Sequence, residues 1–123
     1  MENELFTLRG AVLDFAADNY GTIPDAPWPK YRWNQVLRHS NNKKWYGLLM
    51  RVKYRVLGIE KDGETDVLDL KCTPTAREIL VGEGTALPAY HMNKEKWISL
   101  LLDGTVPAET IFPLLEESYE LTK

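Results

Sequence analysis

The sequence predicts an α+β fold in which an antiparallel sheet of about six strands is combined, in two layers, with an N-terminal, a middle and a C-terminal helix. Helical periodicity occurs near both ends of the chain and once between them, whereas the other segments have the pattern of strands. Short turns such as Asn41-Asn42 and Asp62-Gly63 join these strands, and such turns favour antiparallel neighbours. The length of 123 residues is that of one domain, so we expect a single domain over residues 1–123.

The first half of the chain begins with a predicted helix over residues 2–19, where apolar residues recur at helical spacing. Gly21 should end this helix. Residues 23–29 contain three prolines and should form an extended connector, because proline lacks an amide donor. Strands are then predicted at residues 33–40, 44–52, 54–60 and 66–71.

The second half opens on Thr73-Pro74, which predicts the start of the middle helix. Threonine caps helices, and proline suits the first helical position. Gly82 should end this helix, because glycine accepts a left-handed conformation. Two further strands are predicted at residues 89–92 and 97–102, joined by a polar turn.

The last helix is predicted over residues 107–121, with its apolar residues on one face. Pro113 lies past the first turn, where a proline costs roughly 3 kcal/mol or bends the helix. We therefore expect a kink or a split near Phe112.

Composition indicates a globular protein, with 44% hydrophobic and 27% charged residues. No apolar run approaches the roughly 20 residues that a bilayer requires, and the N-terminus lacks the pattern of a signal peptide. We therefore expect a cytoplasmic protein without a membrane partner. The sequence does not give the oligomeric state, for which a monomer is the favoured interpretation. Cys72 is the only cysteine, which excludes an internal disulfide and a cysteine-based metal cluster. No cofactor and no metal are expected.

Charge is segregated along the chain. Residues 30–55 contain eight basic residues and no acid, whereas the remainder carries seven basic and eighteen acidic residues. The segment thus carries +8 and the remainder −11, which gives the net charge of −3. The sequence pI of about 5.4 is far below the values above 9 that are typical of nucleic-acid-binding domains, so any such binding should be weak and local.

Aromatic residues are interleaved with these cations, a mixture that suits phosphate neutralisation and base stacking. We therefore predict nucleic-acid binding through this segment, with the hairpin at Asn41-Asn42 as the contacting wing. The other interpretation is that the aromatic residues belong to the core and the cations only to a solvated face. The predicted contacts are Lys30, Arg32, Arg38, Lys43, Lys44, Trp45, Arg51, Lys53 and Arg55.

The run PAYHMNKEKWISLLLDGTVP, with DLKCTP before it and EESYEL after it, resembles the MmcQ/YjbR family of small bacterial proteins. The resemblance spans nearly the whole chain and is strongest over residues 66–121. It implies a double-wing fold like that of CyaY and frataxin, a DNA-binding function and no catalytic motif. The residues that carry this signature are Tyr90, His91, Asn93, Lys94 and Trp97.

The signature residues have structural interpretations beside functional ones. His91 and Glu95 have a metal-ligand spacing only within a helix, and we expect a strand and turn. His91 should instead fix the hairpin by a hydrogen bond to the backbone, Asn93 should shape the turn, and Trp97 should pack in the core. A ligand pocket around Tyr90, His91, Asn93 and Lys94 is the alternative.

Cys72 lies before a predicted helix start, where a helix dipole can activate a thiol, but burial as a small hydrophobe is the favoured interpretation. Glycine-rich phosphate loops and nucleophile elbows are absent from the sequence, so we do not expect an enzyme. The predicted function is weak, non-catalytic DNA binding. The alternative is a protein-interaction or small-ligand-binding module.

Overall fold

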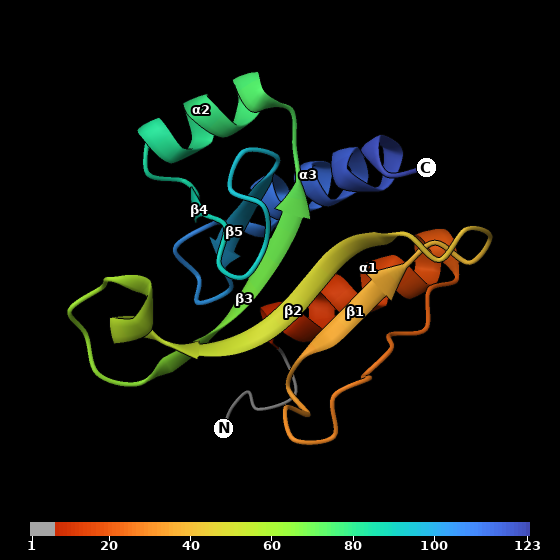
Figure 1. Cartoon of the computed structure of the whole chain (residues 1–123), viewed down its shortest axis with the longest axis horizontal. Coiled ribbons are helices and arrows are strands. Elements are labelled where there is room, and N and C mark those ends of the chain that lie inside the picture. The colour runs from red at the N-terminus through yellow and green to blue at the C-terminus, as the bar shows by residue number, and fades with distance from the viewer. Residues whose placement is uncertain (1–6) are drawn as a thin grey trace.

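The structure is a computed structural model that describes residues 7–123. Its helices are α1 (Leu8–Tyr20), α2 (Pro74–Gly82) and α3 (Ala108–Leu121). Its strands are β1 (Gln35–Arg38), β2 (Trp45–Lys53), β3 (Glu64–Lys71), β4 (Leu87–Pro88) and β5 (Trp97–Leu101). They form one antiparallel sheet in the order β1-β2-β3-β5-β4 (Figure 1). The predicted α+β fold is confirmed, with five strands instead of about six.

The predicted caps at Gly21 and Thr73 are confirmed, but the left-handed cap predicted at Gly82 is wrong, because Gly82 is the last residue of α2 and Glu83 caps it with φ -90°. The predicted first helix also begins later than expected, since Thr7 is extended and caps it. The Thr7 hydroxyl accepts a hydrogen bond from the Gly10 amide at the start of α1, and Gly21 ends the helix with φ 64°. Thr73 caps α2 by accepting from the Ala76 amide. Residues 2–6 of the predicted first helix lie outside the described residues. No helix of the described chain is long and apolar enough to cross a bilayer.

The predicted strand at residues 54–60 is wrong, because the chain leaves the sheet after Lys53. A 3₁₀ helix, η1 (Tyr54–Leu57), follows β2 directly, and Gly58 ends it with φ 82°. The hydroxyl of the buried Tyr54 donates a hydrogen bond to Asp103 over 2.7 Å. This hydrogen bond joins the start of η1 to the chain just after β5.

The predicted strand at residues 89–92 is also wrong. The strand is β4, only two residues long, and residues 89–96 form a loop. His91 has φ 68°, which an extended strand does not allow. The Asn93 side chain accepts hydrogen bonds from the amides of Glu95 and Lys96, so Asn93 shapes the turn as predicted.

Helix α3 runs through Pro113 without interruption, so the predicted split does not occur (Figure 1). Pro113 itself is exposed. Ile111 precedes it, Leu115 and Ser118 follow it, and all three are buried against the sheet. Burial of these flanking residues offsets the roughly 3 kcal/mol that an interior proline costs.

Helices α1 and α3 lie on the same side of the sheet and close the main core there (Figure 1). The opposite face carries a second, smaller apolar cluster from β1, β2 and β3. Two irregular segments cover that cluster in part, namely the connector at residues 22–34 and the loop at residues 89–96. The open face of the sheet therefore has an apolar floor with irregular walls.

A β-bulge on β2 decides which aromatic residue belongs to which face. Leu37 pairs with Gly47 and Arg38 with Trp45, so Tyr46 has no partner on β1. The bulge turns Tyr46 into the helical core, while Trp45 packs on the open face.

Candidate functional site

A groove of about 720 Å³ lies on the open face of the sheet, between the connector and the loop at residues 89–96. Its volume is within the roughly 300–1,000 Å³ range of small-molecule sites. Its floor comes from β2, and its walls come from the two irregular segments and η1. The lining residues are Trp28, Tyr31, Asn34, Trp45, Leu48, Met50, Arg51, Val52, Lys53, Val56, Glu64, Tyr90, His91 and Met92.

Aromatic rings from three separate segments line this groove. Trp28 of the connector meets Trp45 of β2 edge to face, with ring centroids 5.9 Å apart. Tyr90 lies 4.0 Å from the ring of His91 on the opposite wall. Tyr31 is 63% exposed at the mouth, so its ring is available to a ligand. Such a lining offers flat apolar surfaces for stacking a planar group.

Lys94 and Asn93 stabilise the loop at residues 89–96 by hydrogen bonds. His91 does not, so its predicted role is wrong. Lys94 donates from Nζ to the Ala89 carbonyl over 2.8 Å. His91 makes no hydrogen bond within the described chain; it is exposed and lines the groove. Of the signature residues, Tyr90 and His91 therefore reach the groove, whereas Asn93 and Lys94 support the wall that carries them.

A buried carboxyl group lies beside the floor of the groove. Asp69 of β3 is fully buried, and its register partners are Leu48, which lines the groove, and Ser99 of β5. The Ser99 hydroxyl donates to Asp69 Oδ1 over 2.5 Å and accepts from the Tyr90 amide over 2.9 Å. Asp69 Oδ2 has no partner in the described chain. Hydrogen bonding thus connects this carboxyl group to the wall of the groove.

Burial raises the pKa of Asp69 to about 7, although the Ser99 hydrogen bond and the Lys94 charge act to lower it. Between about pH 4 and pH 7 the folded protein therefore holds a proton that the unfolded chain releases. This group loses its stabilising effect as the pH rises through that range. We expect Asp69→Asn to gain stability relative to the wild type between pH 5 and pH 8, as measured by urea unfolding at both values. If the difference in unfolding free energy between the two proteins were the same at pH 5 and pH 8, Asp69 would not be a buried group that titrates in this range.

The predicted cations divide between the two ends of β2, which are about 26 Å apart at 3.3 Å per residue. Lys43 and Lys44 lie at the tip of the β1–β2 hairpin, and residues 54–63 lie at the opposite end of the sheet (Figure 1). Arg38 is tied to Asp25 by an ion pair of 3.0 Å and lies 5.5 Å from the Trp45 ring. Arg51 and Lys53 line the groove, but the hairpin tip does not. Whether either group contacts nucleic acid stays a prediction.

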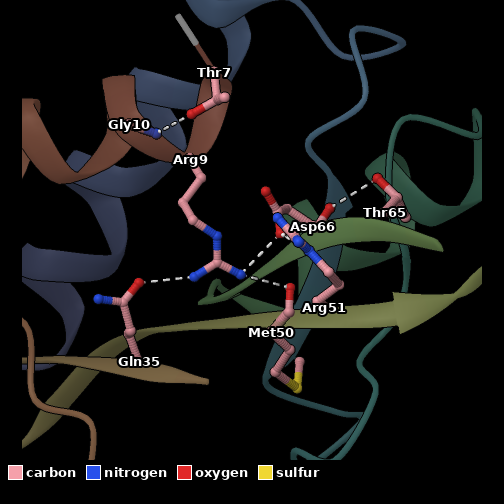
Figure 2. A network of polar contacts seen from close by, with 8 residues as sticks. All are labelled: Thr7, Arg9, Gly10, Gln35, Met50, Arg51, Thr65 and Asp66. Carbon is pink, nitrogen blue, oxygen red and sulfur yellow. Dashed lines mark hydrogen bonds and ion pairs between the residues drawn. The ribbon is translucent and has the colours of Figure 1, made fainter. Parts of the chain in front are cut away.

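Arg51 is one of the lining residues, but its guanidinium belongs to a network of polar contacts with α1, which lies on the other face of the sheet (Figure 2). Its guanidinium lies 3.7 Å from the ring centroid of Trp33, which is 44% exposed. Its Nε donates to Asp66 over 3.1 Å. The buried Arg9 of α1 donates to the same carboxylate oxygen over 2.9 Å, and to Gln35 and the Met50 carbonyl. The network fixes Arg51 against an exposed aromatic ring.

Two other predicted features lie away from the groove. Cys72 is buried in the main core, as the favoured interpretation predicted. Burial raises the pKa of its thiol, whereas an activated nucleophile would need a lowered pKa. Trp97 is half-buried and belongs to neither core cluster of the described chain, so its predicted core position is wrong. Within residues 7–123, no three or more His, Cys, Asp or Glu side chains are grouped so that they could hold a metal ion.

Several groove residues escaped the sequence prediction. Trp28 lies in a proline-rich connector, and Met50 and Met92 have the ordinary appearance of core residues. Asp69 interrupts the apolar strand LDL, and this polar residue in a buried strand was the one available signal. The fold brings these residues together from the connector, β2, β3 and the loop after β4.

The fold and groove define a class of small α+β protein whose sheet carries helices on one face and an aromatic groove on the other. Comparison with known proteins then gives the family. The sequence model of the YjbR family matches residues 17–121, and the chain belongs to this family.

Individual relatives agree with this assignment. The chain is 46% identical over 115 residues to the uncharacterized protein YyaQ of Bacillus subtilis, covering 94% of this chain and 98% of YyaQ. It is 28% identical over 83 residues to the uncharacterized protein YjbR of Escherichia coli K12, covering 66% of this chain and 70% of that protein. A crystal structure from Pseudomonas syringae matches with a TM-score of 0.89 at 44% identity, covering 94% of this chain and 98% of the other. Protein DR2400 of Deinococcus radiodurans matches with a TM-score of 0.70 at 26% identity, covering 94% and 78%.

Proposed function

We propose that this protein binds nucleic acid without catalysis, through bases that stack in the groove and phosphates that meet cations at its rim. The observation that carries the proposal is the aromatic lining next to basic side chains. Arg51 and Lys53 line the groove directly, and Lys30 and Arg32 flank Tyr31 at its mouth. Stacking and phosphate contact are the two components of sequence-tolerant nucleic-acid binding.

The basic residues in and beside the groove support the proposal better than the lysines at the hairpin tip. Lys30, Arg32 and Lys53 are exposed and form no ion pair within the described chain. Lys43 and Lys44 are equally exposed, but the groove with its aromatic rings lies elsewhere. The net charge of −3 opposes a long polyanion, so we expect weak, salt-dependent binding.

The proposal is tested by fluorescence anisotropy of a labelled DNA strand titrated with protein at low and near-physiological salt. Tyr31→Ala should weaken binding about 5- to 150-fold, because loss of one stacking partner costs about 1–3 kcal/mol. Ile23→Ala, at an exposed apolar residue away from the groove, is the matched control and should bind as the wild type does. Absence of wild-type binding at low salt would refute the proposal.

The hairpin tip provides the second comparison. If the groove is the interface, Lys53→Ala should weaken binding more than the double variant Lys43→Ala and Lys44→Ala. The reverse order would instead support the wing predicted from sequence at Asn41-Asn42.

A small planar anion is a second candidate ligand, favoured by the size of the groove. Such a ligand would place its ring between the walls and its charge near Lys53. Titration of mononucleotides, followed by the intrinsic fluorescence of the four tryptophans, of which Trp28 and Trp45 line the groove, distinguishes the two. Binding of a mononucleotide as tight as that of the strand would favour the small ligand.

A further inference from the structure

A second hollow, of about 450 Å³, lies at the end of β2 beside the groove. It is formed by the turn that follows β2 and by the first residue of β3. Six residues line it, namely Lys53, Arg55, Lys61, Asp62, Gly63 and Glu64. Lys61 lies outside the basic segment at residues 30–55 and takes no part in the proposed groove contacts.

The hollow adjoins the groove, because Lys53 and Glu64 line both. These two residues are register partners at the ends of β2 and β3. A ligand that extends from the groove past Lys53 therefore reaches residues that line the hollow. Tyr54, whose amide donates to the Gly63 carbonyl over 3.1 Å, fixes the turn that forms its far side.

Cationic side chains outnumber acidic ones in this hollow by three to two. The ammonium of Lys61 lies 4.6 Å from the ring of Tyr54, and neither Lys61 nor Lys53 forms an ion pair within residues 7–123. Arg55 is paired with Asp62 over 2.9 Å, but both side chains are largely exposed. An exposed pair of this kind is weak, so a phosphate can take the place of Asp62 on the guanidinium.

We propose that the ligand is a single strand that places one unpaired base in the groove and the adjoining phosphate in the hollow of Lys53, Arg55 and Lys61. This inference rests on the proposed function and specifies its substrate class. Stacking on the groove aromatics requires a free base face, which a duplex buries between neighbouring base pairs. The Lys30 and Arg32 side of the groove then meets the phosphate backbone on the other side of the same base.

The test compares a labelled single strand of about ten nucleotides with a duplex of the same length by fluorescence anisotropy at several salt concentrations. The wild type should bind the single strand more tightly. Lys61→Ala should weaken that binding and reduce the logarithmic salt slope by about 0.7, the value for one phosphate contact on a single strand. Lys96→Ala, at another exposed lysine that lines neither hollow, is the matched control and should leave the slope unchanged.

A gain-of-affinity variant completes the test. Glu64 is exposed and lies on the path between groove and hollow, so Glu64→Gln should tighten single-strand binding by up to about fivefold by removing a repulsive charge. Equal or tighter duplex binding, or a Lys61→Ala slope equal to that of the wild type, would overturn this inference while the Tyr31→Ala result still supported the proposed function. Absence of any wild-type binding would refute the proposed function itself.

Discussion

Asp66→Ala is expected to lower the free energy of unfolding by about 3–5 kcal/mol, because it leaves a buried guanidinium without its counter-charge. The side chains of Arg9 and Asp66 are only 8% and 12% exposed. Arg51 shares the same carboxylate oxygen, so two cations lose their partner at once (Figure 2). Urea unfolding at pH 7, monitored by far-UV circular dichroism, measures the effect.

Asp62→Ala is the matched control, since Asp62 also forms an arginine pair but on the surface. We expect this variant to lose at most about 1 kcal/mol. Equal losses from the two variants would contradict the assignment of Asp66 to a buried network.

The same network predicts how stability responds to acid. Burial alone would raise the pKa of Asp66, but the hydrogen bonds and charges of Arg9 and Arg51 hold it below 3.8. A carboxyl group with a lowered folded-state pKa contributes its full stability above its unfolded value, and this contribution disappears as the pH falls through the folded value. The difference in unfolding free energy between wild type and Asp66→Ala should therefore shrink below about pH 4.

Tyr46→Ala is expected to cost about 3–5 kcal/mol, the range for removing a large aromatic side chain from a core. Tyr46 is fully buried, and its ring meets those of Tyr20, Tyr119 and His39. Its hydroxyl forms a 2.6 Å hydrogen bond with the Thr22 hydroxyl. Thermal and urea unfolding of the variant should both shift accordingly.

Two further tyrosine variants show how much of the stability lost in Tyr46→Ala comes from the hydroxyl group and how much depends on burial of the ring. Tyr46→Phe keeps the ring but leaves the buried Thr22 hydroxyl unpaired, which should cost about 1–3 kcal/mol. Tyr31→Ala removes an exposed ring and should change stability by no more than about 0.5 kcal/mol. If Tyr31→Ala lowered the free energy of unfolding as much as Tyr46→Ala, the exposed ring in the connector would stabilise the fold as much as the buried ring at the bulge, which would contradict this assignment.

Both large effects bear on the groove as well as on stability. The Asp66 network holds Arg51, one of the lining residues, against Trp33, and the bulge that buries Tyr46 leaves Trp45 on the open face. Stability and the geometry of the groove therefore depend on the same segment of β2 and on its contacts with β3 and α1. Exposed residues such as Tyr31, Lys53 and Lys61 remain available for testing binding without loss of the fold.

Local chemistry made much of the fold predictable. Thr73 and Gly21 lie at helix ends because the side chain of the first and the backbone conformation of the second satisfy groups that a helix leaves unpaired. The family was likewise visible in contiguous residues after Asp66, since a signature needs no knowledge of distant contacts. These features depend on neighbours along the chain, which the sequence displays directly.

The missed elements depended on contacts between distant residues. Tyr54 begins η1 instead of continuing the sheet, and its hydroxyl donates a hydrogen bond to Asp103, 49 positions later. Pro113 is tolerated because burial on both sides of it holds α3 on the sheet. The residues that decide these two cases are distant in the sequence or become buried only in the folded chain, so no short sequence pattern shows them. In both cases the structure differs from what the local sequence favours, which is a strand at residue 54 and a break in the helix at Pro113.

By itself, the sequence determined the α+β class, the helix caps at Gly21 and Thr73, the segregation of charge and the YjbR family, because each follows from residues close together in the chain. Tertiary structure alone decided which members of the basic, aromatic segment face the groove. A single bulge at Tyr46 and the packing of Trp28 and Tyr90 on the open face divided that segment between core and surface. Side-chain direction in a sheet depends on register, and register depends on the partner strand.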